Sequence, residues 1–208
     1  GVLWAASMFA WFFLSALYMQ LVLGYDAMQV GLAFLPSNLI MAGCSLGLSA
    51  WVVMRFGICR TLGWGLLLAA VGLALFALAP TEGRFVIHVL PGMLLLGVGA
   101  GIALNPLLLA AMGDVKPEDS GLASGVVNTA FMMGGALGLA ILASLADART
   151  DHLREAGASV QQALNAGYQL AFWVSALCAL VAAGLGGFVL RPASPVSYTH
   201  LRAHETRH

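Results

Sequence analysis

Long runs without Asp, Glu, Lys or Arg divide this chain, and short groups of charged or turn-forming residues separate them. A membrane core about 30 Å thick is crossed by roughly 20 apolar helical residues, and each run can supply them. Backbone groups in lipid must be satisfied within the protein, and runs of this length exclude barrel strands. The pattern therefore predicts six transmembrane helices, over residues 2–23, 30–53, 61–80, 86–112, 120–146 and 168–190.

Composition supports an all-α polytopic membrane protein. Charged residues make up 9% of the 208 residues and AVILMFWYC residues 61%, whereas a soluble domain carries about a quarter charged residues. A very apolar soluble core would need charged faces at helical spacing, and the chain has none. The zero net charge gives no indication of a nucleic-acid partner.

The chemistry of an enzyme or metalloprotein is not visible in the sequence. The three cysteines lie in or beside different apolar runs, with no CxxC pair and no metal-ligand spacing. We find no nucleophile–base pair and no phosphate-binding loop. The sequence predicts no enzyme activity, no metal and no cofactor.

The positions of Lys and Arg give an orientation. Four of these residues fall on one side of the predicted bundle (Arg55, Arg60, Lys116 and Arg191), and three on the other (Arg84, Arg149 and Arg154). The positive-inside rule then places both ends of the segment in the cytoplasm. Residues 147–167 are expected to form a long polar exterior loop.

An internal similarity suggests a repeat. Gly31-Leu32-Ala33 and Asn38 recur 90 residues later as Gly121-Leu122-Ala123 and Asn128. Helices one to three would then repeat as helices four to six, with opposite orientation in the membrane. Inverted repeats of three helices are typical of secondary transporters.

Small and amide side chains are candidates for helix packing or gating. Glycines four apart let helix backbones approach closely in lipid, and an unpaired amide in an apolar run is costly. Static packing and the sliding of helices are both compatible with this spacing. The candidates are Asn38, Asn128, Gly43, Gly47, Gly97, Gly101, Gly121, Gly125, Gly134 and Gly138.

One face of the first predicted helix is a candidate substrate surface. Trp4, Met8, Trp11, Ser15 and Tyr18 follow 4-3-4-3 spacing and so share one stripe. Aromatic and methionine side chains suit an adaptable pocket for an apolar ligand. The alternative is that Trp4 and Tyr18 belong to interfacial belts and that Trp11 touches lipid.

A second candidate lies in the fourth predicted helix. Asn105 precedes Pro106, which leaves a backbone carbonyl without its helical partner and favours a kink. A role at a hinge or cavity and a role in packing are both open for this asparagine.

Three stretches resemble the major facilitator superfamily, specifically the C-terminal half of its fourteen-helix drug:proton antiporters. Tyr18-Met19-Gln20 followed by residues 23–36 resembles one signature, and residues 117–138, with Gly-Leu-Ala-Ser-Gly and Gly-Gly-Ala-Leu-Gly, resemble another closely. Arg55, Gly57 and Arg60 fall in a stretch resembling the family's cytoplasmic loop motif. That motif departs from the family at Met54 and Ile58.

The resemblance covers about residues 1–191 and carries expectations about function. It implies one major-facilitator half, a 3+3 inverted repeat in a bacterial inner membrane, acting in proton-coupled export of apolar or cationic compounds. The first and fourth helices would line the central cavity, which places the Trp4–Tyr18 stripe and Asn105 near substrate. The expected partners are the N-terminal half of the same transporter, the bilayer, a small-molecule substrate and protons.

Two ends of the chain have separate interpretations. The sequence starts within an apolar segment without Met, so the N-terminus looks truncated. Residues 192–208 are expected to be a disordered tail, in which 196–206 resemble a translated sequencing adapter and not protein.

Two rival functions remain: a facilitator permease for another solute, and a non-transporting module that acts by helix packing.

Overall fold

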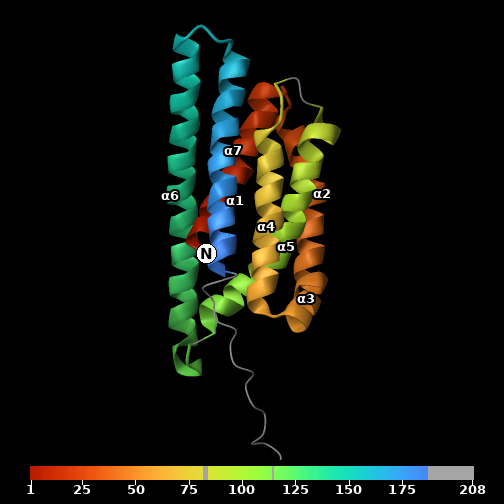
Figure 1. The fold of residues 1–208 in the computed structure, drawn as a ribbon, viewed down its shortest axis with the longest axis vertical. Helices are drawn as coiled ribbons and strands as arrows, with labels where there is room; N and C mark the ends of the chain where they lie inside the picture. Colours follow the sequence, from red (N-terminus) through yellow and green to blue (C-terminus); the bar gives the residue numbers. More distant parts are fainter. Residues whose placement is uncertain (82–83, 114, 187–208) are drawn as a thin grey trace, which may run out of the picture.

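The computed structural model describes residues 1–81, 84–113 and 115–186. Six helices long and apolar enough to cross a membrane are present in this described part (Figure 1). The predicted all-α fold with six membrane spans is therefore confirmed. The end of the sixth predicted helix beyond residue 186 and the tail at 192–208 lie outside the described residues.

Several spans combine α-helical and π-helical segments, and a short 3-10 turn precedes the fifth span. The spans are α1 Val2–Leu17 with η1 Tyr18–Val22; α2 Ala27–Gly43, η2 Cys44–Leu48 and α3 Ser49–Phe56; α4 Ile58–Ala77; η3 Phe85–Val89 with α5 Leu90–Met112; α6 Ser120–Glu155 after η4 Pro117–Asp119; and α7 Val160–Gly184.

Local sequence explains where the spans begin and end. Asp26 caps α2 by accepting a hydrogen bond from the backbone N–H of Gln29, whose side chain reaches back to Asp26. The sequence predicts a break between helices over residues 55–60, but in the structure Gly57 alone separates α3 from α4. Its φ of 82° is a backbone conformation that favours glycine. Arg55 therefore lies in the last turn of α3 and Arg60 in the first turn of α4, so neither belongs to a loop.

The expected exterior loop over residues 147–167 is wrong. α6 continues to Glu155 and α7 starts at Val160, so a tight turn replaces the loop. The two helices pack against each other in this region, where buried Thr150 donates hydrogen bonds to the carbonyls of Ala146 and Ala163. Charged residues on the exposed face are compatible with a helix that extends beyond the lipid, and 36 residues span about 54 Å.

The spans form two groups of three with one main contact between them. α1, α6 and α7 pack together, as do α4, α5 and the α2–α3 span. The packing of α4 on α7 joins the groups (Figure 1). The buried core follows this contact, with Trp11, Leu66, Phe76 and Phe172 among its larger members.

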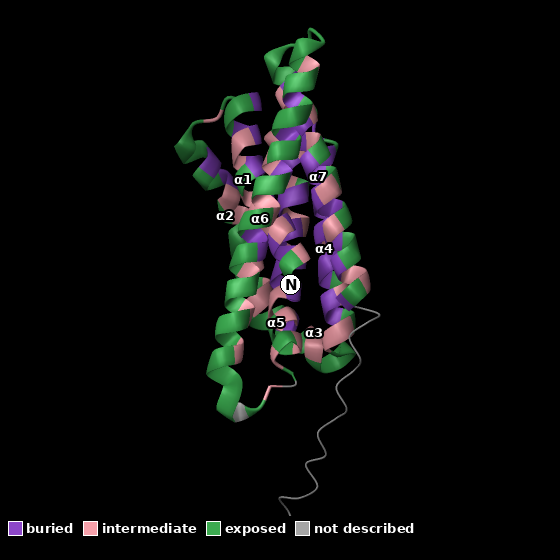
Figure 2. Ribbon diagram, turned by 90° about the vertical axis from the view of Figure 1, so that its left-hand side faces the viewer, coloured by how far each residue is buried: buried purple, intermediate pink, exposed green. Residues whose placement is uncertain are grey.

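Burial divides the spans into two classes. In the spans that contain α1, α4, α5 and α7, between 44% and 56% of the most apolar stretch is buried inside the bundle. The corresponding shares are 6% for the α2–α3 span and 17% for α6. Figure 2 shows α6 as exposed along most of its length. Two spans thus contribute little to the bundle's own core.

Candidate functional site

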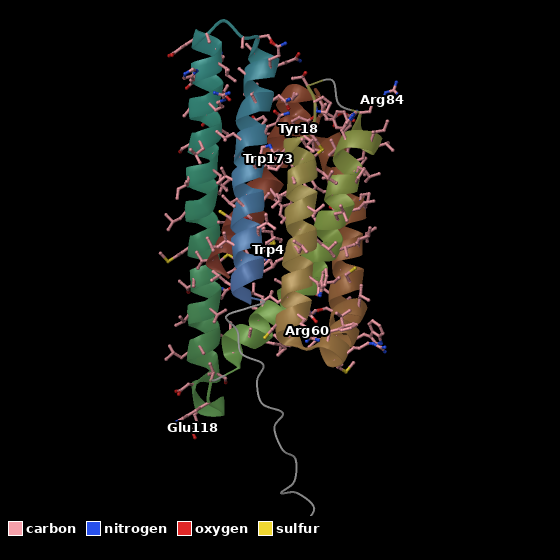
Figure 3. The ribbon with its side chains drawn as sticks, viewed as in Figure 1. Trp4, Tyr18, Arg60, Arg84, Glu118 and Trp173 are labelled. Atoms are coloured by element: carbon pink, nitrogen blue, oxygen red, sulfur yellow. The ribbon has the colours of Figure 1, made fainter. Side chains whose placement is uncertain are left out.

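The stripe on α1 faces the interior of the bundle. Trp4, Trp11, Ser15 and Tyr18 are each 2% exposed or less, and Met8 is half-buried. The alternative in which Trp11 touches lipid is therefore wrong, because α2, α4 and α7 enclose this face. Figure 3 labels Trp4 and Tyr18 at the two ends of α1. The use of the stripe as cavity lining stays a prediction.

Aromatic rings around Trp11 connect four spans. The Trp11 ring lies 5.7 Å from the ring of Phe34 on α2 and 6.4 Å from that of Phe76 on α4. Phe76 in turn lies 5.2 Å from Phe172 on α7. The indole N–H groups of Trp4 and Trp11 are buried and find no hydrogen-bond partner in the described part of the chain. An unpaired buried donor is costly, so both tryptophans retain an unused hydrogen-bond donor.

Hydrogen bonds fasten three spans at the end of α4. The Tyr18 hydroxyl donates to the carbonyl of Pro80 at 2.8 Å. From α7, Gln169 Nε2 and Asn165 Nδ2 donate to the carbonyl of Ala79, at 2.8 Å and 3.3 Å. These bonds hold the first span to Pro80 and α7 to the adjacent Ala79, so the stripe is anchored at its Tyr18 end.

Asn105 links α5 to the π-helical segment of the second span. Its Nδ2 donates to the Ser45 carbonyl at 2.7 Å and to the Ser45 hydroxyl at 3.2 Å. Pro106 has no N–H, so the helical partner of the Ile102 carbonyl is missing. The Ser49 hydroxyl donates to that carbonyl at 3.1 Å. Asn105 is thus used in an interhelical contact with Ser45, and Ser49 on the same span satisfies the carbonyl left open by the proline.

Sequence reasoning missed Ser45 and Ser49. Each is one small hydroxyl residue in an apolar run, and such residues are common in membrane helices. The proline at 106 signals a carbonyl that needs a donor, but the sequence does not show which helix supplies it. Their role depends on the packing of α5 against the second span.

The four glycine pairs separate into two classes. A Cβ at Gly97 or Gly101 would lie 2.6 Å from the carbonyl oxygen of Ser37 or Met41, so α5 meets α2 at these glycines. Gly134 and Gly138 meet α1 at Val2 and Ala6 in the same way. The other two pairs have no atom of the described residues within 4 Å of an added Cβ: Gly43, Gly47, Gly121 and Gly125.

The two asparagines of the suggested repeat are both exposed. Asn38 lies on α2 and Asn128 on α6, the two spans that contribute least to the core. A shallow hollow of about 530 Å³ runs along α6 over Gly121, Gly125 and Thr129. Neither asparagine is packed inside the bundle, and their proposed gating role stays a prediction.

The chain is similar to known membrane transport proteins. Residues 1–139 match the family model described as Major Facilitator Superfamily. The cephamycin export protein CmcT of Amycolatopsis lactamdurans is 34% identical over 140 residues, which is 67% of this chain and 29% of that protein. The puromycin resistance protein pur8 of Streptomyces alboniger is 34% identical over 171 residues, or 79% of this chain and 34% of that protein.

A mycobacterial protein is also similar. The uncharacterized MFS-type transporter EfpA of Mycobacterium tuberculosis is 33% identical over 147 residues, or 66% of this chain and 26% of that protein. The chain therefore spans about a third, or less, of the length of the curated relatives it matches.

Proposed function

The chain belongs to the major facilitator superfamily, and from this premise we propose that it is the C-terminal half of a proton-coupled exporter. The exporter would carry apolar or cationic small molecules out of the cell by alternating access. The observation that supports this most directly is the similarity to proteins named for cephamycin export and puromycin resistance. The six membrane spans provide the half-transporter unit. An enzyme activity is no part of the proposal.

The proposed substrate contacts are the α1 stripe and Asn105. The support for the stripe is the aromatic cluster around Trp11 together with the two buried indole N–H groups, which find no acceptor among the described residues. A substrate that offers an acceptor could pair with these donors once the bundle rearranges. Aromatic faces also attract organic cations. The stripe would then be closed in this conformation and reached in another.

The proton-coupling residues are proposed to lie in the other half. Residues 1–25, 27–54, 61–81, 85–113 and 120–146 contain no Asp, Glu, Lys or Arg. An ion or proton relay in a membrane usually depends on such groups. The N-terminal half of the transporter is therefore the proposed partner, and the open faces of the α2–α3 span and α6 are the proposed contact surfaces.

The proposed location is the bacterial inner membrane, with both ends of the segment in the cytoplasm. A cysteine at Ala156, in the turn between α6 and α7, should react with a membrane-impermeant maleimide from outside the cell. One at Val115, between α5 and α6, should react only after the membrane is opened. Labelling of Val115 from outside would reverse the orientation.

Export by the full-length transporter tests the function. Cells that express it should extrude a fluorescent lipophilic cation, and a protonophore should abolish the extrusion. Trp11→Phe keeps the ring cluster but removes one buried N–H, so export of an acceptor-bearing substrate should fall several-fold at equal expression. Trp173→Phe is the matched control, because Trp173 is 49% exposed on α7.

Three outcomes separate the proposals. Uptake of a solute with no extrusion would favour a permease, and no transport at all would favour a helix-packing module. Equal effects of the two tryptophan substitutions would remove the stripe from the substrate site while leaving the exporter assignment intact.

A further inference from the structure

A tryptophan–arginine pair flanks each side of the turn between α3 and α4. Trp51 precedes Arg55 by four residues, and Arg60 precedes Trp64 by four, with Gly57 between the pairs. Residues four apart lie on the same face of a helix, one turn from each other. On both helices the arginine is therefore nearer the turn and the tryptophan one turn further into the apolar span.

All four side chains are directed away from the core. Trp51 is 53% exposed and Trp64 is 64% exposed, and both arginines are exposed. The Arg55 guanidinium lies 5.7 Å from the centre of the Trp51 ring and 5.9 Å from that of Phe56. These ring contacts position Arg55 at the end of α3 without neutralising its charge. Figure 3 shows Arg60 at the same end of the bundle, where α4 begins.

The two arginines have no acidic residue near them in the sequence. Residues 27–81 contain no Asp or Glu. Asp26 caps the far end of the 30-residue α2–α3 span, about 45 Å away along the helix. Glu118 lies at the same end of the bundle as Arg60 but well apart from it (Figure 3). Within the described residues, the positive charge of this turn is therefore available to an anionic partner.

We propose that this turn binds the headgroup of an anionic phospholipid, with Arg55 and Arg60 on the phosphate. Guanidinium groups form paired hydrogen bonds with phosphate oxygens. Tryptophans concentrate at the headgroup level of membranes, and anionic lipids attract arginines at that surface. A soluble phosphate would also satisfy the arginines, but two exposed indoles one turn deeper fit a lipid. This inference does not depend on the proposed transport function.

Native mass spectrometry of the chain in detergent tests the site, with phosphatidylglycerol or phosphatidylcholine added. Each arginine near an anionic surface contributes about fivefold, so Arg55→Gln with Arg60→Gln should lower the preference for phosphatidylglycerol about 25-fold. Arg149→Gln with Arg154→Gln is the matched control. It also removes two exposed arginines five residues apart, but acidic Asp151 and Glu155 lie among them. The control should keep the preference.

Further variants test the proposal if the double variant Arg55→Gln with Arg60→Gln, called the glutamine pair, fails to fold. Arg55→Lys with Arg60→Lys should retain most of the preference, and Trp51→Leu with Trp64→Leu should weaken it. Millimolar inorganic phosphate should leave bound phosphatidylglycerol in place. The proposal is overturned if the glutamine pair binds this lipid like the original chain or if the control loses as much. Displacement by phosphate, or an unchanged preference in the leucine pair, would overturn it as well.

Discussion

The α5 and α6 helices each carry small residues at GxxxG spacing, yet these serve different surfaces. On α5, Gly97 and Gly101 are buried against the backbone of α2. On α6, Gly134 and Gly138 meet α1. Gly121 and Gly125 lie about two and a half turns or more earlier on the same helix, and an added Cβ at either would meet no atom of the described residues within 4 Å. The same motif therefore closes the bundle in one place and leaves an open face in another.

The open faces are the surfaces on which the proposed partner half would pack. Apolar side chains can face lipid, but an exposed amide such as Asn38 or Asn128 is costly there. Both asparagines lie on the two spans with the smallest buried share. The comparison between packed and open surfaces thus separates what stabilises the six-helix unit from what is available to a partner.

The largest expected effect comes from filling a packed glycine. In Gly101→Ala the new Cβ would lie 2.6 Å from the Met41 carbonyl oxygen and 2.8 Å from Cys44 Cβ, so α5 and α2 must separate. We expect the free energy of unfolding to fall by about 1–3 kcal/mol, measured by detergent-induced unfolding.

Gly47→Ala is the counterpart on an open face. No atom lies within 4 Å of its added Cβ, so the unfolding free energy should hold or rise by about 0.5–1 kcal/mol. A comparable loss in both variants would mean that the packed and open classes do not differ.

A smaller effect is expected at the proline break of α5. Ser49→Ala leaves the Ile102 carbonyl without the Ser49 hydroxyl and without a helical N–H, because residue 106 is proline. The cost should be about 1 kcal/mol of unfolding free energy. Ser144→Ala serves as the control, since that exposed hydroxyl bonds only within its own helix, to Ala140. Equal costs would show that Ile102 finds another donor.

The smallest effect is expected at the end of the α1 stripe. Tyr18→Phe removes the hydroxyl that donates to Pro80 but keeps the buried ring. The unfolding free energy should fall by about 0.6 kcal/mol, the average for interhelical hydrogen bonds in membranes. Tyr25→Phe, in the neighbouring loop, should change it less. A reversed order would indicate that the bond to Pro80 does not anchor α1.

The sequence was sufficient for the membrane spans but not for their full length. Runs without charged residues mark where a helix crosses lipid, and these runs predict all six membrane spans of the described structure. The same criterion ended the fifth helix at residue 146, although α6 continues to Glu155. Beyond the lipid a helix tolerates charged residues such as Arg149 and Asp151, so its end is set by Gly157 and by packing on α7.

The candidate residues could be named from the sequence, but not their partners. Spacing predicted that Trp4, Trp11 and Tyr18 share one face of α1. Whether that face meets lipid, a cavity or the core depends on how α4 and α7 pack, which local spacing does not contain. The Ser49–Ile102 contact is similar, since it joins residues 53 positions apart.

We propose that the open faces of the α2–α3 span and α6 meet another part of the transporter, and quenching by lipid measures this contact directly. Single cysteines at Asn38, Asn128 and Trp173 of the full-length protein can carry a fluorophore that brominated lipids quench. Trp173 is the reference, because it is exposed on α7. We expect strong quenching at 173, weak quenching at 38 and 128, and a change at the latter two when substrate is added. Quenching at 38 and 128 as strong as that at 173, and indifferent to substrate, would contradict the claim.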